Sequence, residues 1–97
     1  MRVVAEEPWD WYLFDDDGVY YLNVLVEHGC ISYDVTAPLD ADQAAVYASE
    51  GKEILMQLAR DMRSQALMHQ WKAGPLPADW GARSIVAAHE WQRRNGC

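Results

Sequence analysis

Apolar residues recur at helical spacing over residues 40–72, the longest regular pattern in the chain. Charged and amide side chains hold most of the other positions, as in a helix with one buried and one solvated face. Asp40 and Gln43 have the spacing of a capping box, and Pro38 just before them disfavours helix. The pattern therefore predicts a long helix that begins at Asp40. Its apolar positions are Ala44, Tyr47, Ala48, Leu55, Leu58, Met62 and Ala66.

Gly51 interrupts the apolar stripe of this helix, four residues from both Tyr47 and Leu55. Glycine inside a helix costs about 1 kcal/mol relative to alanine. Two interpretations of Gly51 are open. It is a hinge or kink, or it lets a neighbouring strand or aromatic ring come closer than a side chain would allow. The close approach explains why Gly51 lies on the apolar stripe without further assumptions. A straight helix over 40–72 would be about 50 Å long, against a radius of gyration of about 13 Å for a domain of this length. We therefore expect the helix to bend, break or project.

Three strand patterns separated by turn signals precede this helix. The first is aromatic-rich, the second is apolar on both faces apart from Asn23, and the third alternates, which predicts Ile31, Tyr33 and Val35 on a buried face. The Asp-Gly pair that ends the run of residues 15–18 and the segment 27–29 are turn signals. The sequence predicts an α+β fold, a three-stranded antiparallel meander covered by the long helix. The three strands are Trp9–Phe14, Val19–Val26 and Cys30–Thr36.

The C-terminal part predicts a Gly/Pro loop over 73–81 and a last helix over 82–94. That helix is expected to face inward through Ile85, Val86 and His89, with Ala82 as a further inward position. No repeat or linker interrupts the pattern, so residues 1–97 are predicted to form a single domain.

The N-terminal segment turns acidic at once and lacks the apolar run of a secretory signal. No stretch approaches the roughly 18 apolar residues of a membrane span. We therefore expect a cytoplasmic protein. Two cysteines do not make a disulfide framework, and we expect Cys30 to be free and buried and Cys97 to be free at the terminus.

Charge is distributed unevenly along the chain, whose net charge is −7. Residues 1–51 hold eleven acids and a single base, whereas residues 52–97 hold four acids and seven bases. Such an acidic half disfavours nucleic-acid binding, which needs lysine and arginine against phosphate. It suits a basic protein partner, although the acids could equally serve solubility.

The sequence contains no complete metal or catalytic motif. A calcium loop begun at Asp15 needs a glutamate at its twelfth position, which is Val26. His28 and Cys30 could form a nucleophile pair, or part of a zinc site, but no feature supplies the orienting group or fixes further ligands. His89-Glu90 begins a zinc-protease pattern whose second histidine is replaced by Arg93. We therefore expect no metal or cofactor and no enzymatic activity.

Five tryptophans are many for one core of this size. Trp9 and Trp11 lie two apart on one strand among carboxylates, a composition typical of interfaces with apolar anchors and a charged rim, while core packing is the alternative for each ring. The resulting candidate partner-binding residues are Glu6, Glu7, Trp9, Asp10, Trp11, Asp15, Asp16 and Asp17.

Residues 9–72 resemble the immunity proteins of bacterial polymorphic and contact-dependent toxin systems. The resemblance lies in the aromatic meander, in the segment 32–39 (Ser-Tyr-Asp-Val-Thr-Ala-Pro-Leu) that leads into the helix, and in Tyr-Ala-Ser-Glu-Gly at 47–51. It implies a cytoplasmic protein that neutralises one cognate toxin by tight binding, often by covering a cationic nuclease site. Those families share no catalytic motif, so no residue role is carried over. A regulatory subunit that dimerises through the long helix is the alternative, and a small enzyme using His28 or Cys30 is a third hypothesis.

Overall fold

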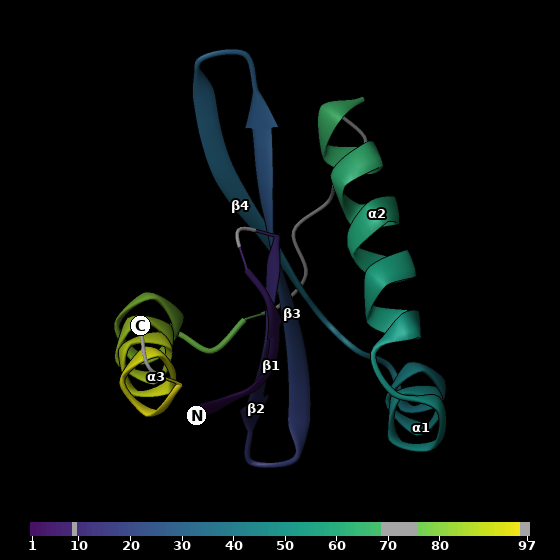
Figure 1. Cartoon of the computed structure of the whole chain (residues 1–97), viewed down its shortest axis with the longest axis vertical. Helices are drawn as coiled ribbons and strands as arrows, with labels where there is room; N and C mark the ends of the chain where they lie inside the picture. The colour runs from purple at the N-terminus through teal and green to yellow at the C-terminus, as the bar shows by residue number, and fades with distance from the viewer. Residues whose placement is uncertain (9, 69–75, 96–97) are drawn as a thin grey trace.

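The computed structural model describes residues 1–8, 10–68 and 76–95, which contain four strands and three helices in an α+β arrangement (Figure 1). The strands form one antiparallel sheet in the order β1-β2-β3-β4, so each strand pairs with its neighbour in the chain. The elements are β1 (Arg2–Glu7), β2 (Trp11–Asp16), β3 (Val19–His28), β4 (Ile31–Pro38), α1 (Ala41–Glu50), α2 (Glu53–Leu67) and α3 (Trp80–Arg94).

The predicted meander is present, but a fourth strand precedes it. β1 pairs with β2, and its register shifts between Val3 and Ala5. This irregularity puts Val4 out of the two-residue alternation, and the acids that follow obscure the rest of the pattern. The prediction of three strands was wrong for this reason, while the central place of β3 between β2 and β4 is confirmed.

Both hairpin turns have two residues. Asp17 and Gly18 join β2 to β3 with φ of 56° and 90°, as in a type I′ turn, so this predicted turn is confirmed. The second turn is Gly29-Cys30 instead of the expected 27–29, because β3 continues through His28. Cys30 therefore lies exposed at the tip of the hairpin, which corrects the expectation of a buried cysteine.

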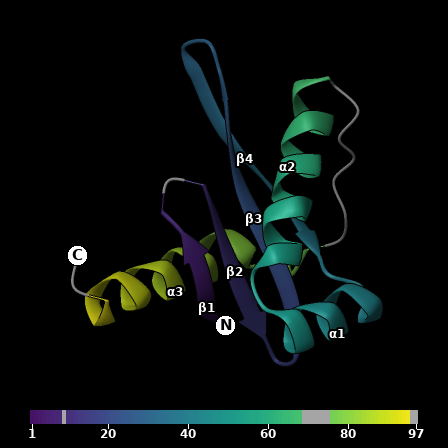
Figure 2. The same cartoon turned by 45° about the vertical axis from the view of Figure 1, so that its right-hand side comes forward.

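The sheet has a helical layer on each face (Figures 1 and 2). α2 packs on one face and α3 on the other, and β3 contributes side chains to both. The larger core lies under α2 and includes Trp11, Leu13, Leu22, Val24, Val26, Val35, Leu55, Ala59, Met62 and Ala66. The smaller core lies under α3 and consists of Val3, Phe14 and Ala87 with Tyr12, Tyr21, Trp80 and Trp91 partly buried around them.

The long helix begins where predicted and breaks at Gly51. Asp40 and Gln43 form both hydrogen bonds of the capping box ahead of α1. Gly51 caps α1 at φ 84° and ψ −150°, and a Cβ there would meet nothing within 4 Å. The glycine is required by backbone conformation, so the expected close approach was wrong. The break suits the radius of gyration of 13.1 Å. Residues 69–72 of the predicted helix lie outside the described residues.

α3 begins earlier than predicted and turns a different face to the sheet. Trp80, Arg83, Ala87 and Trp91 are buried or half-buried, at spacings of three and four residues. The expected inward residues Ala82, Ile85, Val86 and His89 are exposed, so this assignment was wrong. Two tryptophan rings bury more surface than isoleucine and valine, which decides the face. Of the predicted loop, residues 73–75 lie outside the described part and residues 80–81 belong to α3.

The β3–β4 hairpin extends past the first residue of β2 and projects from the sheet (Figure 2). Val26 and Val35 are buried under α2, but Ile31 and Tyr33 near the tip are 67% and 39% exposed. Only Val35 of the three residues expected on the buried face is covered. None of the helices in the described ranges is long and apolar enough to cross a membrane.

Candidate functional site

A pocket of about 410 Å³ lies on the α3 face of the sheet, beside the last turn of α3. Tyr12, Asn23 and Leu25 of β2 and β3 lie on the face where Phe14 and Tyr21 contact α3, because side chains two apart on a strand share a face. We call this hollow the acidic pocket. Its remaining described lining residues are Glu6, Pro8, Asp10, Trp11, Asp34 and Gln92.

Asn23 lies on the side of the pocket toward β4 and forms hydrogen bonds with two residues of that strand. Its side-chain amide donates to Asp34 Oδ2 at 3.0 Å and to Thr36 Oγ1 at 2.8 Å, both on the neighbouring strand. Asn23 is the single polar residue in the first eight positions of β3. Its hydrogen bonds explain this interruption of an otherwise apolar run and hold the Asp34 carboxylate beside the pocket.

Three carboxylates and no lysine or arginine stand among the described lining residues. Asp10 forms an ion pair with Arg63 of α2, whose Nε also donates to Leu25 O at 3.1 Å. Glu6 accepts a hydrogen bond from the Trp91 indole N–H at 2.7 Å. Within the described residues, the carboxylates of Glu6 and Asp34 thus have neutral hydrogen-bond donors and form no ion pair.

The pocket can hold a cation that carries an apolar stem. Tyr12, Leu25 and Pro8 supply apolar surface, and the carboxylates attract positive charge. Lysine and arginine side chains have this combination of an aliphatic stem and a charged end. A guanidinium can also bind a carboxylate through two parallel hydrogen bonds.

The structure divides the predicted partner-binding residues between the two ends of β2. Glu6, Asp10 and Trp11 line the acidic pocket, and Glu7 is exposed at the end of β1. Trp11 is only 2% exposed and belongs to the core under α2. Its ring is therefore mainly a core residue, as the alternative interpretation of the tryptophans held. Trp9 lies outside the described residues.

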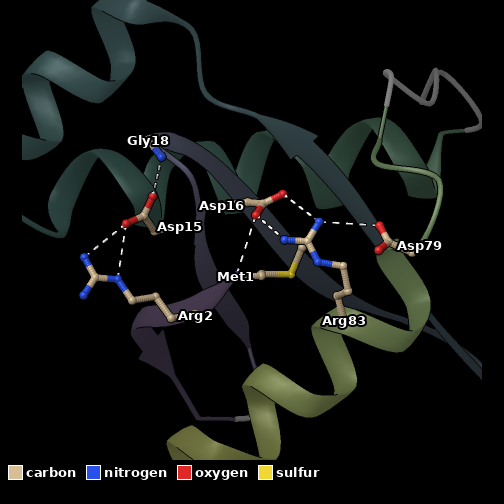
Figure 3. A network of polar contacts seen from close by, with 7 residues as sticks. All are labelled: Met1, Arg2, Asp15, Asp16, Gly18, Asp79 and Arg83. Carbon is tan, nitrogen blue, oxygen red and sulfur yellow. Dashed lines mark hydrogen bonds and ion pairs between the residues drawn. The ribbon is translucent and has the colours of Figure 1, made fainter.

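Asp15, Asp16 and Asp17 lie at the other end of β2, roughly 17 Å away at about 3.3 Å per residue. Asp15 accepts hydrogen bonds from the Arg2 guanidinium and from the Gly18 N–H, as Figure 3 shows. Asp17 is exposed, and its side chain forms no hydrogen bond or ion pair with the described residues. The three acids of this turn are therefore not equivalent.

Asp16 forms ion pairs with both Arg83 and the Met1 amino group (Figure 3). It binds both ends of the Arg83 guanidinium, at 2.5 and 3.2 Å, and lies 3.6 Å from the Met1 amino group. The hydrogen bonds that Arg83 donates to Asp16 raise the pKa of Arg83, with Asp79 adding to the same effect. These contacts join α3 to the β2–β3 hairpin, so Asp16 has a structural role.

Six lining residues of the pocket were not among the predicted partner-binding residues: Pro8, Tyr12, Asn23, Leu25, Asp34 and Gln92. The one available signal was Asn23, a polar residue inside an apolar strand. The alternation of the third predicted strand places Asp34 on the face opposite Tyr33, but nothing in its local pattern connects it to Glu6.

No three His, Cys, Asp or Glu side chains within residues 1–8, 10–68 and 76–95 are grouped so that they could hold a metal ion. Cys30 is exposed at the hairpin tip and His89 is exposed on α3. No family model, curated protein or solved structure matches the chain.

Proposed function

We propose that this chain is a small binding protein for a basic protein partner, and that the acidic pocket receives a lysine or arginine side chain of that partner. The observation that carries the proposal is the composition of the pocket: three carboxylates around apolar surface, with no cation among its described lining residues. Of the three, Asp10 is paired with Arg63 of α2, and Glu6 and Asp34 form no ion pair within the described residues. The acidic half of the sequence extends the same charge over the surrounding surface.

The resemblance to immunity proteins supports a more specific form of this proposal. In that form the partner is a toxin, and association blocks a cationic site in the cytoplasm of the producing cell. The proposal requires no catalytic step and no cofactor. The alternative of a dimer through the long helix has less support, because the apolar face of α2 is already buried against the sheet.

The test compares two double variants with equal net charge. Glu6→Gln with Asp34→Asn removes two charges from the acidic pocket while both side chains can still accept their hydrogen bonds from Trp91 and Asn23. Asp42→Asn with Glu50→Gln removes two charges from α1 and serves as the matched control. A partner is captured from the native host, and association and dissociation rates are measured for each variant at two ionic strengths.

The pocket variant should weaken binding by about 10-fold or more, a free-energy change of about 1.4 kcal/mol. It should also lose much of the salt dependence of the association rate, because nearby charges steer the encounter. The α1 variant should retain most of the affinity. An acidic partner, or equal effects of the two double variants, would exclude the pocket as the binding site.

The exposed acid of the β2–β3 turn can be tested in the same assay. Changing Asp15 and Asp16 would also break internal contacts, so a loss of binding there could come from a loss of stability. Asp17→Asn leaves those contacts in place. A slower association for this variant at low salt would extend the contact surface to the turn.

A further inference from the structure

The free end of the β3–β4 hairpin is an unpartnered piece of sheet edge. Trp11, the first residue of β2, pairs with Val24, and the Leu25 N–H still donates to Asp10 O at 2.9 Å. Beyond Leu25, β4 is the one described strand that pairs with β3. α2 supports one face of this extension: Val26 and Val35 are buried, and Tyr33 Oη donates to the Ala66 carbonyl at 3.5 Å. On the outer side of β4, no other described strand pairs with it.

The direction of the β4 backbone groups follows from one hydrogen bond. The Leu39 N–H donates to Tyr20 O on the β3 side at 2.9 Å. Because antiparallel strands alternate, Tyr33 and Val35 also direct their N–H and C=O toward β3, whereas Ser32 and Asp34 direct theirs outward. Ser32 and Asp34 are exposed, and these outward groups have no hydrogen-bond partner within residues 1–8, 10–68 and 76–95.

This part of the edge lacks a bulge, a lysine and a proline, three features that usually prevent strand pairing, and Asp34 is the one charged residue of β4. β1, at the opposite edge of the sheet, is irregular between Val3 and Ala5. β4 pairs with β3 over eight consecutive residues without a shift, carries no lysine, and has no proline before Pro38. A regular, exposed edge of this kind is a template for another strand.

The two faces beside this edge differ in chemistry. The α2 face presents exposed apolar residues: Ile31 and Tyr33 from β4, and Leu67 and Met68 at 37% and 63% exposure where α2 ends. The other face carries Asp34, which lines the acidic pocket. Strand alternation puts Glu27 of β3 on the same face. An added strand would therefore meet apolar surface on one side and carboxylates on the other.

We propose that an extended segment of the basic partner adds to the sheet along β4 at Ser32–Asp34. Its side chains alternate, with lysine or arginine directed toward Asp34 and the acidic pocket and apolar residues directed toward Ile31 and Tyr33. The four outward backbone groups of Ser32 and Asp34 provide affinity that does not depend on sequence, and the two faces select the alternating pattern. This inference rests on the proposed function and specifies how the partner is recognised.

The experiment uses the full chain labelled with ¹⁵N and a synthetic peptide, acetyl-Lys-Val-Arg-Val-Lys-Val-amide. Binding should slow hydrogen exchange of the Ser32 and Asp34 amides at least several-fold, because both gain hydrogen bonds. The amides of Tyr33 and Val35 are already directed to β3 and should change much less. The peptide with glutamate in place of each basic residue should give no protection.

A pair of variants at one position separates the backbone from the side chain. Ser32→Pro removes an outward N–H without removing a bond to β3, a position at which edge strands accept proline. Ser32→Ala keeps the N–H and is the matched control. Peptide affinity should fall about 3- to 10-fold for the proline variant, the effect of one hydrogen bond, and stay near wild type for alanine. Retained protection of the Tyr33 amide shows that the proline variant is folded.

The outcomes separate this inference from the proposed function. Peptide-induced changes confined to the acidic pocket, without protection of Ser32 and Asp34, would exclude strand addition and leave the pocket proposal standing. Equal protection by the acidic peptide, or no binding of either peptide, would also exclude it. Protection that rises with protein concentration without peptide would assign the edge to a second copy of the chain and overturn the proposed occupant. The pocket proposal fails separately, through the partner-binding rates of the two double variants.

Discussion

Replacing Gly51 by alanine should destabilise the protein through backbone conformation alone. Gly51 has φ 84° and ψ −150°, a region that only glycine adopts readily. A Cβ at this position would meet no atom beyond its chain neighbours within 4 Å, so a clash with the surrounding structure does not contribute. The effect of Gly51→Ala therefore measures the conformational requirement of the break between α1 and α2.

The magnitude follows from two opposing terms. Holding a residue other than glycine in such a conformation costs of order 1–3 kcal/mol. Alanine also restricts the unfolded chain, which returns about 0.4–1 kcal/mol. The net loss should be about 1–2 kcal/mol, and a domain of this size loses about 4–8 °C in Tm for each kcal/mol.

Urea and thermal unfolding followed by circular dichroism would measure this loss. D-alanine, introduced by chemical synthesis, is the matched control, because its mirror-image preference makes φ 84° and ψ −150° equivalent to an ordinary extended conformation. It should be clearly more stable than the L-alanine variant. An unchanged or higher Tm for L-alanine would refute the conformational account, and equal losses for both enantiomers would indicate close packing instead.

Three further predictions concern the core, the docking of α3 and high pH. Leu55→Ala, at a fully buried position of α2, should cost about 2–5 kcal/mol in urea unfolding, whereas Met56→Ala at 49% exposure should cost less than about 0.5. Trp91→Phe removes the hydrogen bond to Glu6 and should cost about 1–2 kcal/mol, with the change in near-ultraviolet circular dichroism showing whether α3 stays docked. Burial, and to a lesser degree Tyr20, raises the pKa of Tyr47 above 10.0, so the folded protein holds this proton more tightly than the unfolded chain. Its contribution to stability is complete below pH 10 and is lost as pH rises through the raised pKa; Tyr47→Phe should reduce the fall in Tm above pH 10, and an unchanged fall would contradict this assignment.

Features that depend on a few neighbouring residues could be predicted from the sequence. The Asp17-Gly18 turn was recognisable because positive φ at two successive positions selects these residue types. The start of α1 was recognisable because the Asp40 and Gln43 side chains bond to each other's backbone N–H groups. The order of β2, β3 and β4 followed from short turns, which allow only adjacent antiparallel pairing.

Features that depend on competition between distant segments needed the tertiary structure. α3 has two apolar stripes, and only contact with Phe14 and Tyr21 of the sheet selects the one that contains Trp80. The break at Gly51 also needed the tertiary structure. From the sequence alone, a glycine on the apolar stripe of a helix is compatible with a kink or with the close approach of a neighbouring segment.

The acidic pocket was the least predictable feature. Glu6 and Gln92 come from opposite ends of the described chain, and Asp34 joins them through the β3–β4 register and the hydrogen bond from Asn23. The sequence determined that the N-terminal half is acidic and its strands amphipathic, because composition and alternation are local properties. Which carboxylates form ion pairs within the described residues was decided by the fold, since Arg63 and Arg83, both from the C-terminal half, pair with Asp10 and Asp16, whereas Glu6 and Asp34 accept from neutral donors there.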